Sequence, residues 1–248
     1  MSLQKQQMTQ EQINNNKKFE YLVENYKEIC YNIKDSKSKY RDSDDNIRIM
    51  AVTKTVEPEL INFAIEQGID LLGENRVQEF LSKKDSYKPC EVQFIGHLQT
   101  NKVKYIVGDV SQIQSVDSFK LAQEIDRQAR KIDKVMDILI EVNIGDELSK
   151  SGISKNDVLE LAKRITELPN VRINGLMAIP PIGADDNIYA SLQELYHEIG
   201  QKKINRINMN VLSVGMSGDY SKAVKYGSNL VRIGTMLFGA RKYLEVSK

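Results

Sequence analysis

The chain has 248 residues, of which 41% are hydrophobic, and its 35 basic and 34 acidic side chains leave a formal net charge of +1. This balance does not favour nucleic acid or an anionic membrane surface as a partner, and we expect neither. With two widely separated cysteines and two histidines, the sequence has too little material for a cysteine or histidine metal site, so we expect no metal.

The first 46 residues are predicted to form a helix and a connector. Apolar residues recur at helical spacing over residues 8–34, and the acidic stretch 35–46 has turn composition. The amino terminus is polar and lacks a signal-peptide pattern, and no stretch of the chain has the roughly 20 apolar residues that span a bilayer. We therefore expect a soluble protein whose N-terminal helix packs on the domain that follows, and the two separated cysteines, which form no disulfide pattern, favour the reducing cytoplasm.

From residue 47 onward, short apolar or β-branched runs alternate with helical patterns. Candidate strands lie at 47–53, 70–72, 92–95, 112–115, 136–143, 171–178, 210–213 and 229–233. Helical patterns lie at 58–67, 77–84, 98–107, 118–132, 155–168, 188–202 and 217–226. This rhythm predicts an α/β fold, a single (β/α)8 TIM-like barrel over residues 47–248 with an extra N-terminal helix. An open, doubly wound sheet is the alternative, but no G-x-G-x-x-G follows the first strand.

The first predicted strand ends in a lysine, in the segment IRIMAVTK. In a barrel, Lys54 lies at the carboxyl-terminal end of that strand, where enzymes with this fold place their active sites. A lysine amine can condense with an aldehyde, so Lys54 is a candidate attachment point for a carbonyl compound. A solvated charge at a strand end is the alternative interpretation.

Two glycine-containing turns follow the seventh and eighth strands, in SVGMSGDY and VRIGTMLFG. Ser217 is predicted to cap the next helix, and Gly215 and Gly218 let the backbone approach an anion closely. Gly234 and Thr235 add a backbone N–H group and a hydroxyl. Because barrel closure places the last strand beside the first, we predict one pocket for a phosphorylated carbonyl compound, with pyridoxal 5'-phosphate (PLP) as the candidate.

Two further side chains are predicted to reach this ligand. Asn75, in GENRVQE after the second strand, either caps the following helix or contacts the cofactor ring. Arg232 lies at the end of the last strand, and a guanidinium beside the pyridine nitrogen would keep that nitrogen unprotonated. An unprotonated ring is a poor electron sink, so we expect little catalysis and assign no catalytic residue.

The segments AVTKT, LLGENRVQE, FIGHLQTNK, EVNIGDELSKSG, GLMAIPP, LSVGMSGDY and VRIGTMLFGAR together resemble the pyridoxal phosphate homeostasis protein family, which is related to the N-terminal barrel of alanine racemase. The resemblance implies a barrel of PLP fold type III with the cofactor as an internal aldimine. The cofactor-binding residues that it implies are Lys54, Asn75, Met216, Ser217, Arg232, Gly234 and Thr235.

The family is understood to bind and buffer PLP in vitamin B6 homeostasis, with no established catalytic activity. For this chain the resemblance implies a monomeric carrier that delivers PLP to PLP-requiring apoenzymes. Two alternatives stay open. One is a PLP-dependent amino-acid racemase that uses Lys54 as its sole base or together with a tyrosine from its own loops, and the other is a barrel that binds another phosphorylated metabolite without a cofactor.

Overall fold

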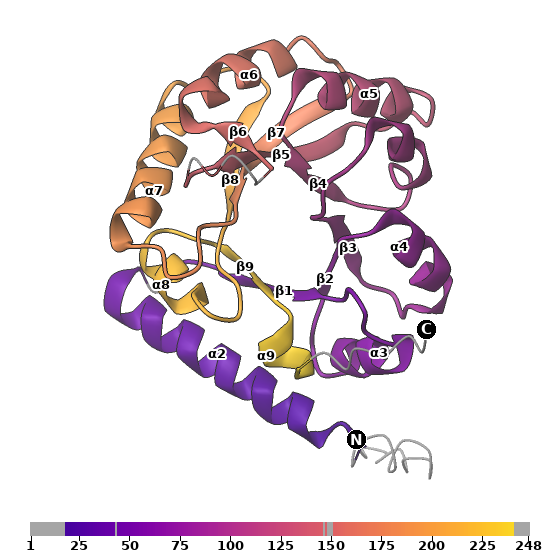
Figure 1. Ribbon diagram of the computed structural model, residues 1–248, viewed down its shortest axis with the longest axis vertical. Helices are drawn as coiled ribbons and strands as arrows, with labels where there is room; N and C mark the ends of the chain where they lie inside the picture. The colour runs from indigo at the N-terminus through magenta and orange to yellow at the C-terminus, as the bar shows by residue number, and fades with distance from the viewer. Residues whose placement is uncertain (1–17, 43, 146, 148–150, 241–248) are drawn as a thin grey trace, which may run out of the picture.

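The structure, a computed structural model, describes residues 18–42, 44–145, 147 and 151–240. Its sheet has nine parallel strands; eight of them close into a ring in the order β1-β2-β3-β4-β5-β7-β8-β9, and β6 pairs with β5 beside the ring (Figure 1). The closed ring confirms the predicted (β/α)8 barrel. The strands are β1 (Arg48–Val52), β2 (Leu71–Glu74), β3 (Glu91–Phe94), β4 (Gln112–Val116), β5 (Met136–Asn143), β6 (Ile153–Ser154), β7 (Val171–Ala178), β8 (Ile207–Ser213) and β9 (Leu230–Ile233).

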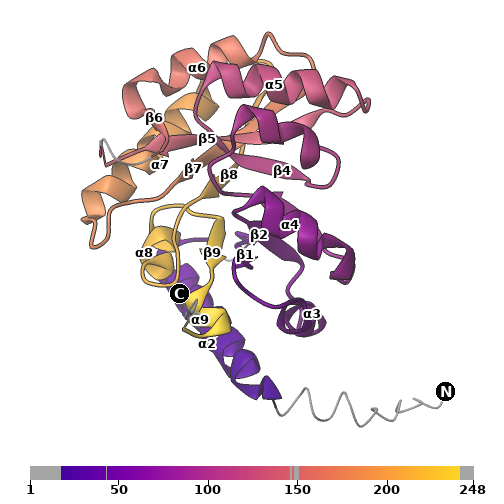
Figure 2. The ribbon, with the colours of Figure 1, turned by 45° about the vertical axis from the view of Figure 1, so that its right-hand side comes forward.

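Helices follow the strands and cover the outside of the ring (Figure 2). Most lie where the apolar spacing predicts them, and α5 begins at the predicted cap, because the Ser118 hydroxyl accepts a hydrogen bond from the Leu121 N–H group at 3.4 Å. They are α3 (Pro58–Glu66), α4 (Val77–Lys83), η1 (Lys84–Ser86), α5 (Phe119–Arg130), η3 (Lys155–Asp157), α6 (Val158–Ile165), α7 (Asp186–Gln201), α8 (Tyr220–Lys225) and α9 (Thr235–Phe238).

One predicted helix is wrong in type. The segment 98–107 forms the three-ten helix η2 (Thr100–Tyr105) instead of an α-helix. The N–H groups of Lys102 and Ile106 donate to the carbonyls of Gln99 and Val103, three residues back, which is the three-ten pattern. β-branched residues in this short segment lower its α-helical propensity, while the buried Val103 and Ile106 produce the apolar spacing of a helix.

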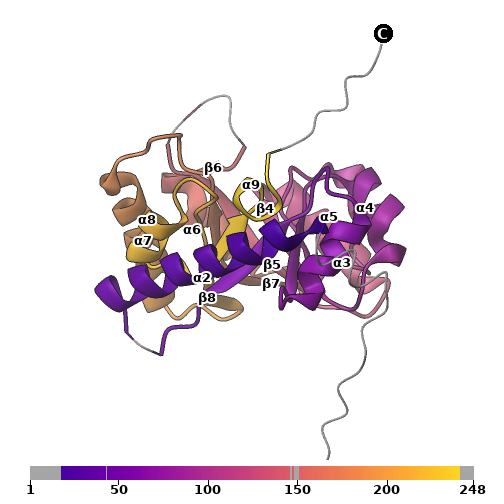
Figure 3. The same ribbon diagram turned by 90° about the horizontal axis from the view of Figure 1, so that it is seen from below.

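The N-terminal helix α2 (Glu20–Tyr40) packs along α8 and α9 on one side of the barrel (Figure 3). Asn32 Nδ2 donates a hydrogen bond to the Tyr220 hydroxyl at 2.8 Å. Asn25 Nδ2 donates to the Leu237 carbonyl at 3.1 Å. α2 thereby contacts the two helices that follow β8 and β9, the strands whose turns are predicted to hold the ligand.

The predicted carboxyl-terminal boundary of this helix is wrong. Turn composition predicts a connector from residue 35, but α2 continues to Tyr40. Asp35 and Lys39 form an i,i+4 ion pair at 2.7 Å and Ser36 is buried, so both faces of the extra turn have partners.

Residues 8–17 of the predicted helix lie outside the described part of the chain, and a domain division at residue 46 stays a prediction. In the described ranges, no helix is both long and apolar enough to cross a membrane.

The alternation of side chains along β1 decides which of them lie inside the barrel. Met50 and Val52 belong to one apolar cluster, whereas Ala51 belongs to another that includes residues of α2 and α8. Helices cover the outside of the ring, so the first cluster is the interior one. Successive residues of a strand point to opposite faces, so the inward series through residues 50 and 52 continues to Lys54 at the carboxyl-terminal end.

Candidate functional site

The backbone on both sides of Lys54 is anchored. The Thr53 hydroxyl is fully buried and donates to Glu74 Oε1 at 2.7 Å. The Thr55 N–H group donates to Glu79 Oε1 at 2.5 Å, and Thr55 has a φ of 61°. A positive φ is unusual for a β-branched residue, so surrounding contacts must hold this turn. The half-buried Lys54 side chain therefore projects from a fixed position at the end of β1.

The turns after β8 and β9 meet beside the end of β1. Ser217 Oγ accepts a hydrogen bond from the Met236 N–H group at 3.2 Å, which joins the two turns directly. A Cβ atom placed on Gly234 would lie 3.6 Å from the Cβ of Val52, two residues before Lys54. The structure therefore brings the predicted lysine and the two predicted glycine turns together at one end of the barrel.

These turns carry unpaired backbone donors. Within the described part of the chain, the N–H groups of Ser217, Gly218 and Thr235 donate to no acceptor. Ser217 and Thr235 also bring hydroxyls, and Gly218 and Thr235 are exposed to solvent. A Cβ atom on Gly218 would meet no other atom within 4 Å, so space is open above this turn. Unpaired N–H groups on two adjoining turns suit an anion.

One expectation for the first turn is wrong. Ser217 does not cap α8, because Asp219 is the N-cap residue, and Asp219 Oδ1 accepts from the Met216 N–H group at 2.6 Å. Gly215 has a φ of 99°, and a Cβ atom there would lie 2.6 Å from the Cβ of Ala223. Packing against α8 therefore explains this glycine, and its close approach to an anion stays a prediction. The Met216 side chain is 36% exposed at the same turn.

Arg232 is a buried cation on the inner side of β9. Its Nη1 donates to the backbone carbonyl and the hydroxyl of Ser213, both at 2.7 Å, and its Nη2 donates to the Ala178 carbonyl at 2.9 Å. Burial lowers the pKa of Arg232 to about 10, so the guanidinium still carries its charge at neutral pH. Arg232 thus ties β9 to β8 and β7 below the two turns.

Asn75 does not cap the helix that follows it. Arg76 is the N-cap residue of α4, and no side chain caps this helix, so the capping alternative is wrong. Asn75 Oδ1 is buried and lacks a hydrogen-bond partner among the described residues. Because native structures pair most buried polar atoms, an unpaired one at this end of the barrel is a position where a ligand can bind.

Sequence reasoning missed Glu141, a buried residue of β5. Its Oε1 accepts from the Ser151 hydroxyl at 2.6 Å. The pKa of Glu141 is raised above its usual value, because burial raises it more than the hydrogen bond from Ser151 lowers it. One sequence signal could have identified Glu141. It is an acidic residue that follows the apolar run 138–140 and precedes Val142 in a predicted strand.

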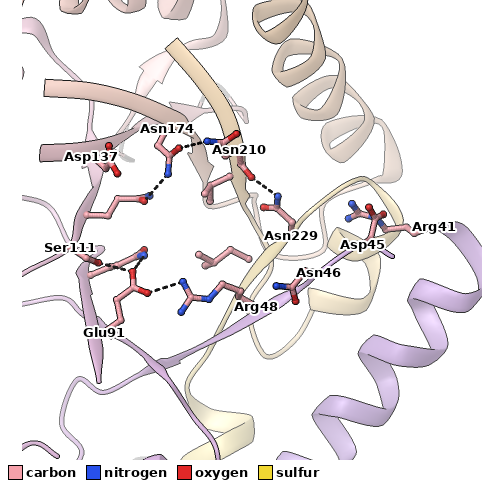
Figure 4. Close-up of a pocket in the computed structure, with 14 residues that line it drawn as sticks. Arg41, Asp45, Asn46, Arg48, Glu91, Ser111, Asp137, Asn174, Asn210 and Asn229 are labelled. Atoms are coloured by element: carbon pink, nitrogen blue, oxygen red, sulfur yellow. Dashed lines mark hydrogen bonds and ion pairs between the residues drawn. The ribbon is translucent and has the colours of Figure 1, made fainter. Parts of the chain in front are cut away.

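Two cavities lie at opposite ends of the barrel. A depression of about 470 Å³ at the carboxyl-terminal end is lined by Asn75, His97 and residues of α4. A cavity of about 510 Å³ at the other end is lined by residues near the starts of the strands, among them Arg48, Glu91 and Asn210 (Figure 4). None of the predicted site residues lines this amino-terminal cavity.

Over the ranges that the structure describes, no group of three or more His, Cys, Asp or Glu side chains could hold a metal ion.

Residues 25–242 match the family model described as alanine racemase, N-terminal domain. The chain is 44% identical over 202 residues to the pyridoxal phosphate homeostasis protein of Aquifex aeolicus, with 79% of this chain and 88% of that protein covered. It is 35% identical over 230 residues to the protein of the same name from Pasteurella multocida, with 90% of this chain and 98% of that protein covered.

Solved structures show the same relationship. PipY of Synechococcus elongatus, with PLP bound, aligns with a TM-score of 0.75 and 28% identity over 88% of this chain and 100% of that chain. Alanine racemase of Clostridium difficile aligns with a TM-score of 0.67 and 16% identity over 92% of this chain and 59% of that chain, which shows a shared fold alone. The chain therefore belongs to the pyridoxal phosphate homeostasis protein family, whose barrel matches the N-terminal domain of alanine racemase.

Proposed function

We propose that this protein binds PLP reversibly and buffers or delivers it in vitamin B6 homeostasis. The observation that carries the proposal is the convergence of Lys54 with the unpaired N–H groups of Ser217, Gly218 and Thr235. PLP has an aldehyde and a phosphate, which match an amine and an anion site at one end of a barrel. The names of the two relatives and the PLP bound to PipY support the same ligand.

In this proposal Lys54 Nζ holds the aldehyde carbon of PLP through a covalent bond that forms with loss of water and is broken by water. When bound, PLP supplies an electrophilic carbon conjugated to its ring. The anchored backbone at Thr53 and Thr55 fixes the origin of the lysine side chain, so little reorganisation is needed for the amine to reach one position.

The two turns are proposed to hold the phosphate. The N–H groups of Ser217, Gly218 and Thr235 and two hydroxyls would surround its oxygens, and Gly234 would leave room for them. The half-exposed Met216 is proposed to lie at the edge of the ligand. Asn75 is proposed to contact the ring with its unpaired side-chain oxygen or, after rotation of the amide, with its nitrogen.

Arg232 is proposed to face the ring nitrogen. A fixed cation there disfavours protonation of that nitrogen, because two adjacent positive charges repel. The hydrogen bonds to Ser213 and Ala178 hold the guanidinium inside the barrel, in line with this role. An unprotonated ring withdraws electrons poorly, so we propose a carrier without strong catalysis.

A titration with PLP, followed by absorbance, tests the binding. Saturable binding is expected for the parent protein, with loss of the visible chromophore in Lys54→Ala. Lys27→Ala is the matched control, because Lys27 is an exposed lysine on α2 with a salt bridge to Glu24 and should bind as the parent does. A protein that binds a phosphorylated sugar but gives no spectral response to PLP would contradict the proposal.

The alternative is an amino-acid racemase in which Lys54 moves the α-proton, and the fold shared with alanine racemase is the observation that favours it. Incubation of the PLP-loaded protein with L- and D-amino acids in D2O measures deuterium uptake at the α-carbon. We expect no faster uptake than with free PLP. Faster uptake that disappears in Lys54→Ala would favour the racemase.

We also propose that the protein is a cytoplasmic monomer that passes PLP to PLP-requiring apoenzymes. Light scattering should then give a mass near 28.3 kDa, and a dimer mass would contradict the monomer. Mixing the loaded protein with an apoenzyme should restore that enzyme's activity at least as fast as the same amount of free PLP does. Slower recovery would indicate storage without delivery.

A further inference from the structure

A chain of side-chain hydrogen bonds crosses the interior of the barrel from Arg232 to Glu91. Arg232 Nη1 donates to the Ser213 hydroxyl at 2.7 Å, and that hydroxyl donates to Gln114 Oε1 at 2.7 Å. Gln114 Nε2 donates to Gln93 Oε1 at 2.6 Å, and Gln93 Nε2 donates to Glu91 Oε1 at 2.7 Å. We name these residues the polar relay.

The middle of the polar relay is closed to solvent, whereas its far end is not. Gln93 is 3% exposed, and Gln114 and Ser213 are completely buried. Glu91 lines the amino-terminal cavity, where Arg48 and Ser111 also donate to its carboxylate (Figure 4). A buried amide or hydroxyl that lost its partner would raise the free energy of the folded state, so each link supports the next.

The chemistry of the two ends fixes the direction of every hydrogen bond in the relay. A guanidinium has only donors, an ionised carboxylate has only acceptors, and a hydroxyl donates one proton. Although burial acts in the other direction, hydrogen bonds from Ser111, Gln93 and Arg48 hold the pKa of Glu91 below its usual value. The Ser213 hydroxyl therefore directs its proton at Gln114 and presents its lone pairs to Arg232.

We propose that Ser213, Gln114 and Gln93 are positioning residues that hold the Arg232 guanidinium in one orientation. The inference rests on the proposed function, since this guanidinium is the group proposed to face the PLP ring nitrogen. The carbonyls of Ser213 and Ala178 also accept from Arg232, but these backbone groups do not depend on Gln114. Without the Gln114 acceptor, the Ser213 hydroxyl is free to rotate and its bond to Arg232 weakens.

The test replaces the amide of Gln114 with an apolar group of similar length. In Gln114→Met, NMR of arginine-labelled protein without PLP should show the Arg232 guanidinium protons exchanging with water about tenfold faster, as expected for one weakened buried hydrogen bond. The Arg232 signals are those that are absent from the spectrum of the Arg232→Lys variant. Unchanged exchange in Gln114→Met would overturn the proposal.

Gln112→Met is the matched control. Gln112 lies on the same strand, β4, and is 4% exposed, but its side-chain oxygen accepts from Asn174 Nδ2 at 3.3 Å, outside the relay. Exchange at Arg232 should be unchanged in this variant, and equal acceleration in both variants would overturn the proposal.

A second measurement uses the unaltered protein, in case Gln114→Met does not fold. The side-chain amide protons of Gln93 and Gln114 should be protected from exchange with water, and exchange at the rate of a free amide would contradict the relay. Both measurements need no bound PLP. A protein that fails to bind PLP therefore contradicts the proposed function and leaves the relay to be decided separately.

Discussion

The two ends of the barrel are both polar, but they differ in how their polar groups are satisfied. At the amino-terminal end, Arg48 pairs with Glu91 and with Asp70, although the nitrogen of the buried Gln112 amide lacks a partner. At the carboxyl-terminal end, backbone N–H groups of the last two turns and the Asn75 oxygen are unpaired within the described ranges. The larger cavity lies at the paired end. A set of unpaired donors on adjoining turns, rather than one unpaired amide or the larger of the two cavities, therefore identifies the end that suits the ligand.

The two arginines on the inner side of the ring should differ most. Arg232→Met removes the charged donor to the buried acceptors of Ser213 and Ala178, so we expect a loss of about 3–5 kcal/mol in the free energy of unfolding. Arg48→Met removes a half-exposed ion pair and should cost about 1 kcal/mol or less. Urea unfolding measures both, and equal losses would contradict the contrast between the two ends.

Alanine substitutions at the two glycines of the SVGMSGDY turn should have different effects on stability. Gly215→Ala places a Cβ atom against Ala223 at a positive φ and should destabilise the protein by about 2–3 kcal/mol. Gly218→Ala meets open space and should change stability by less than about 0.5 kcal/mol. Thermal or urea unfolding tests the pair. A large loss of stability in Gly218→Ala would contradict the open space beside Gly218.

Ser217→Ala should weaken PLP binding more than it weakens the fold. The variant removes one hydroxyl from the proposed phosphate site, so the dissociation constant for PLP should rise about tenfold. Ser38→Ala, which removes an exposed hydroxyl on α2, is the control and should bind PLP as the parent does. Unchanged affinity in Ser217→Ala would remove this side chain from the proposed site.

Glu74 and Glu91, which lie at opposite ends of the barrel, should change the free energy of unfolding in opposite directions as the pH rises. Burial raises the pKa of Glu74, so this residue contributes stability below its unfolded pKa, and that contribution is lost as the pH rises through the folded pKa. The pKa of Glu91 is held low, so its contribution is present above the unfolded pKa and is lost as the pH falls through the folded pKa.

Urea unfolding of Glu74→Gln and Glu91→Gln between about pH 4 and about pH 7 measures these contributions. Relative to the parent, Glu74→Gln should become more stable as the pH rises, and Glu91→Gln should become less stable. The same trend in both variants would contradict the assigned environments.

The barrel and Lys54 were predictable because their signals are local. Period-two and helical patterns identify strands and helices from neighbouring residues, and the position of Lys54 follows from the end of one strand. The partner of Ser217 was not predictable, because it is Met236 on the next turn and is brought there only by folding. The same reason hid the polar relay, in which Gln93 of β3, Gln114 of β4 and Ser213 of β8 meet. The three-ten geometry of η2 was hidden because its apolar spacing is that of an α-helix.

Borohydride reduction of the PLP-loaded protein, followed by mass spectrometry of its peptides, shows which lysine forms the covalent bond with PLP. PLP should become permanently attached to the peptide that contains Lys54. Lys54→Ala should give no such attachment, while Lys27→Ala should give it in full. Attachment to a different lysine, or no attachment in a protein saturated with PLP, would show that Lys54 does not hold the cofactor.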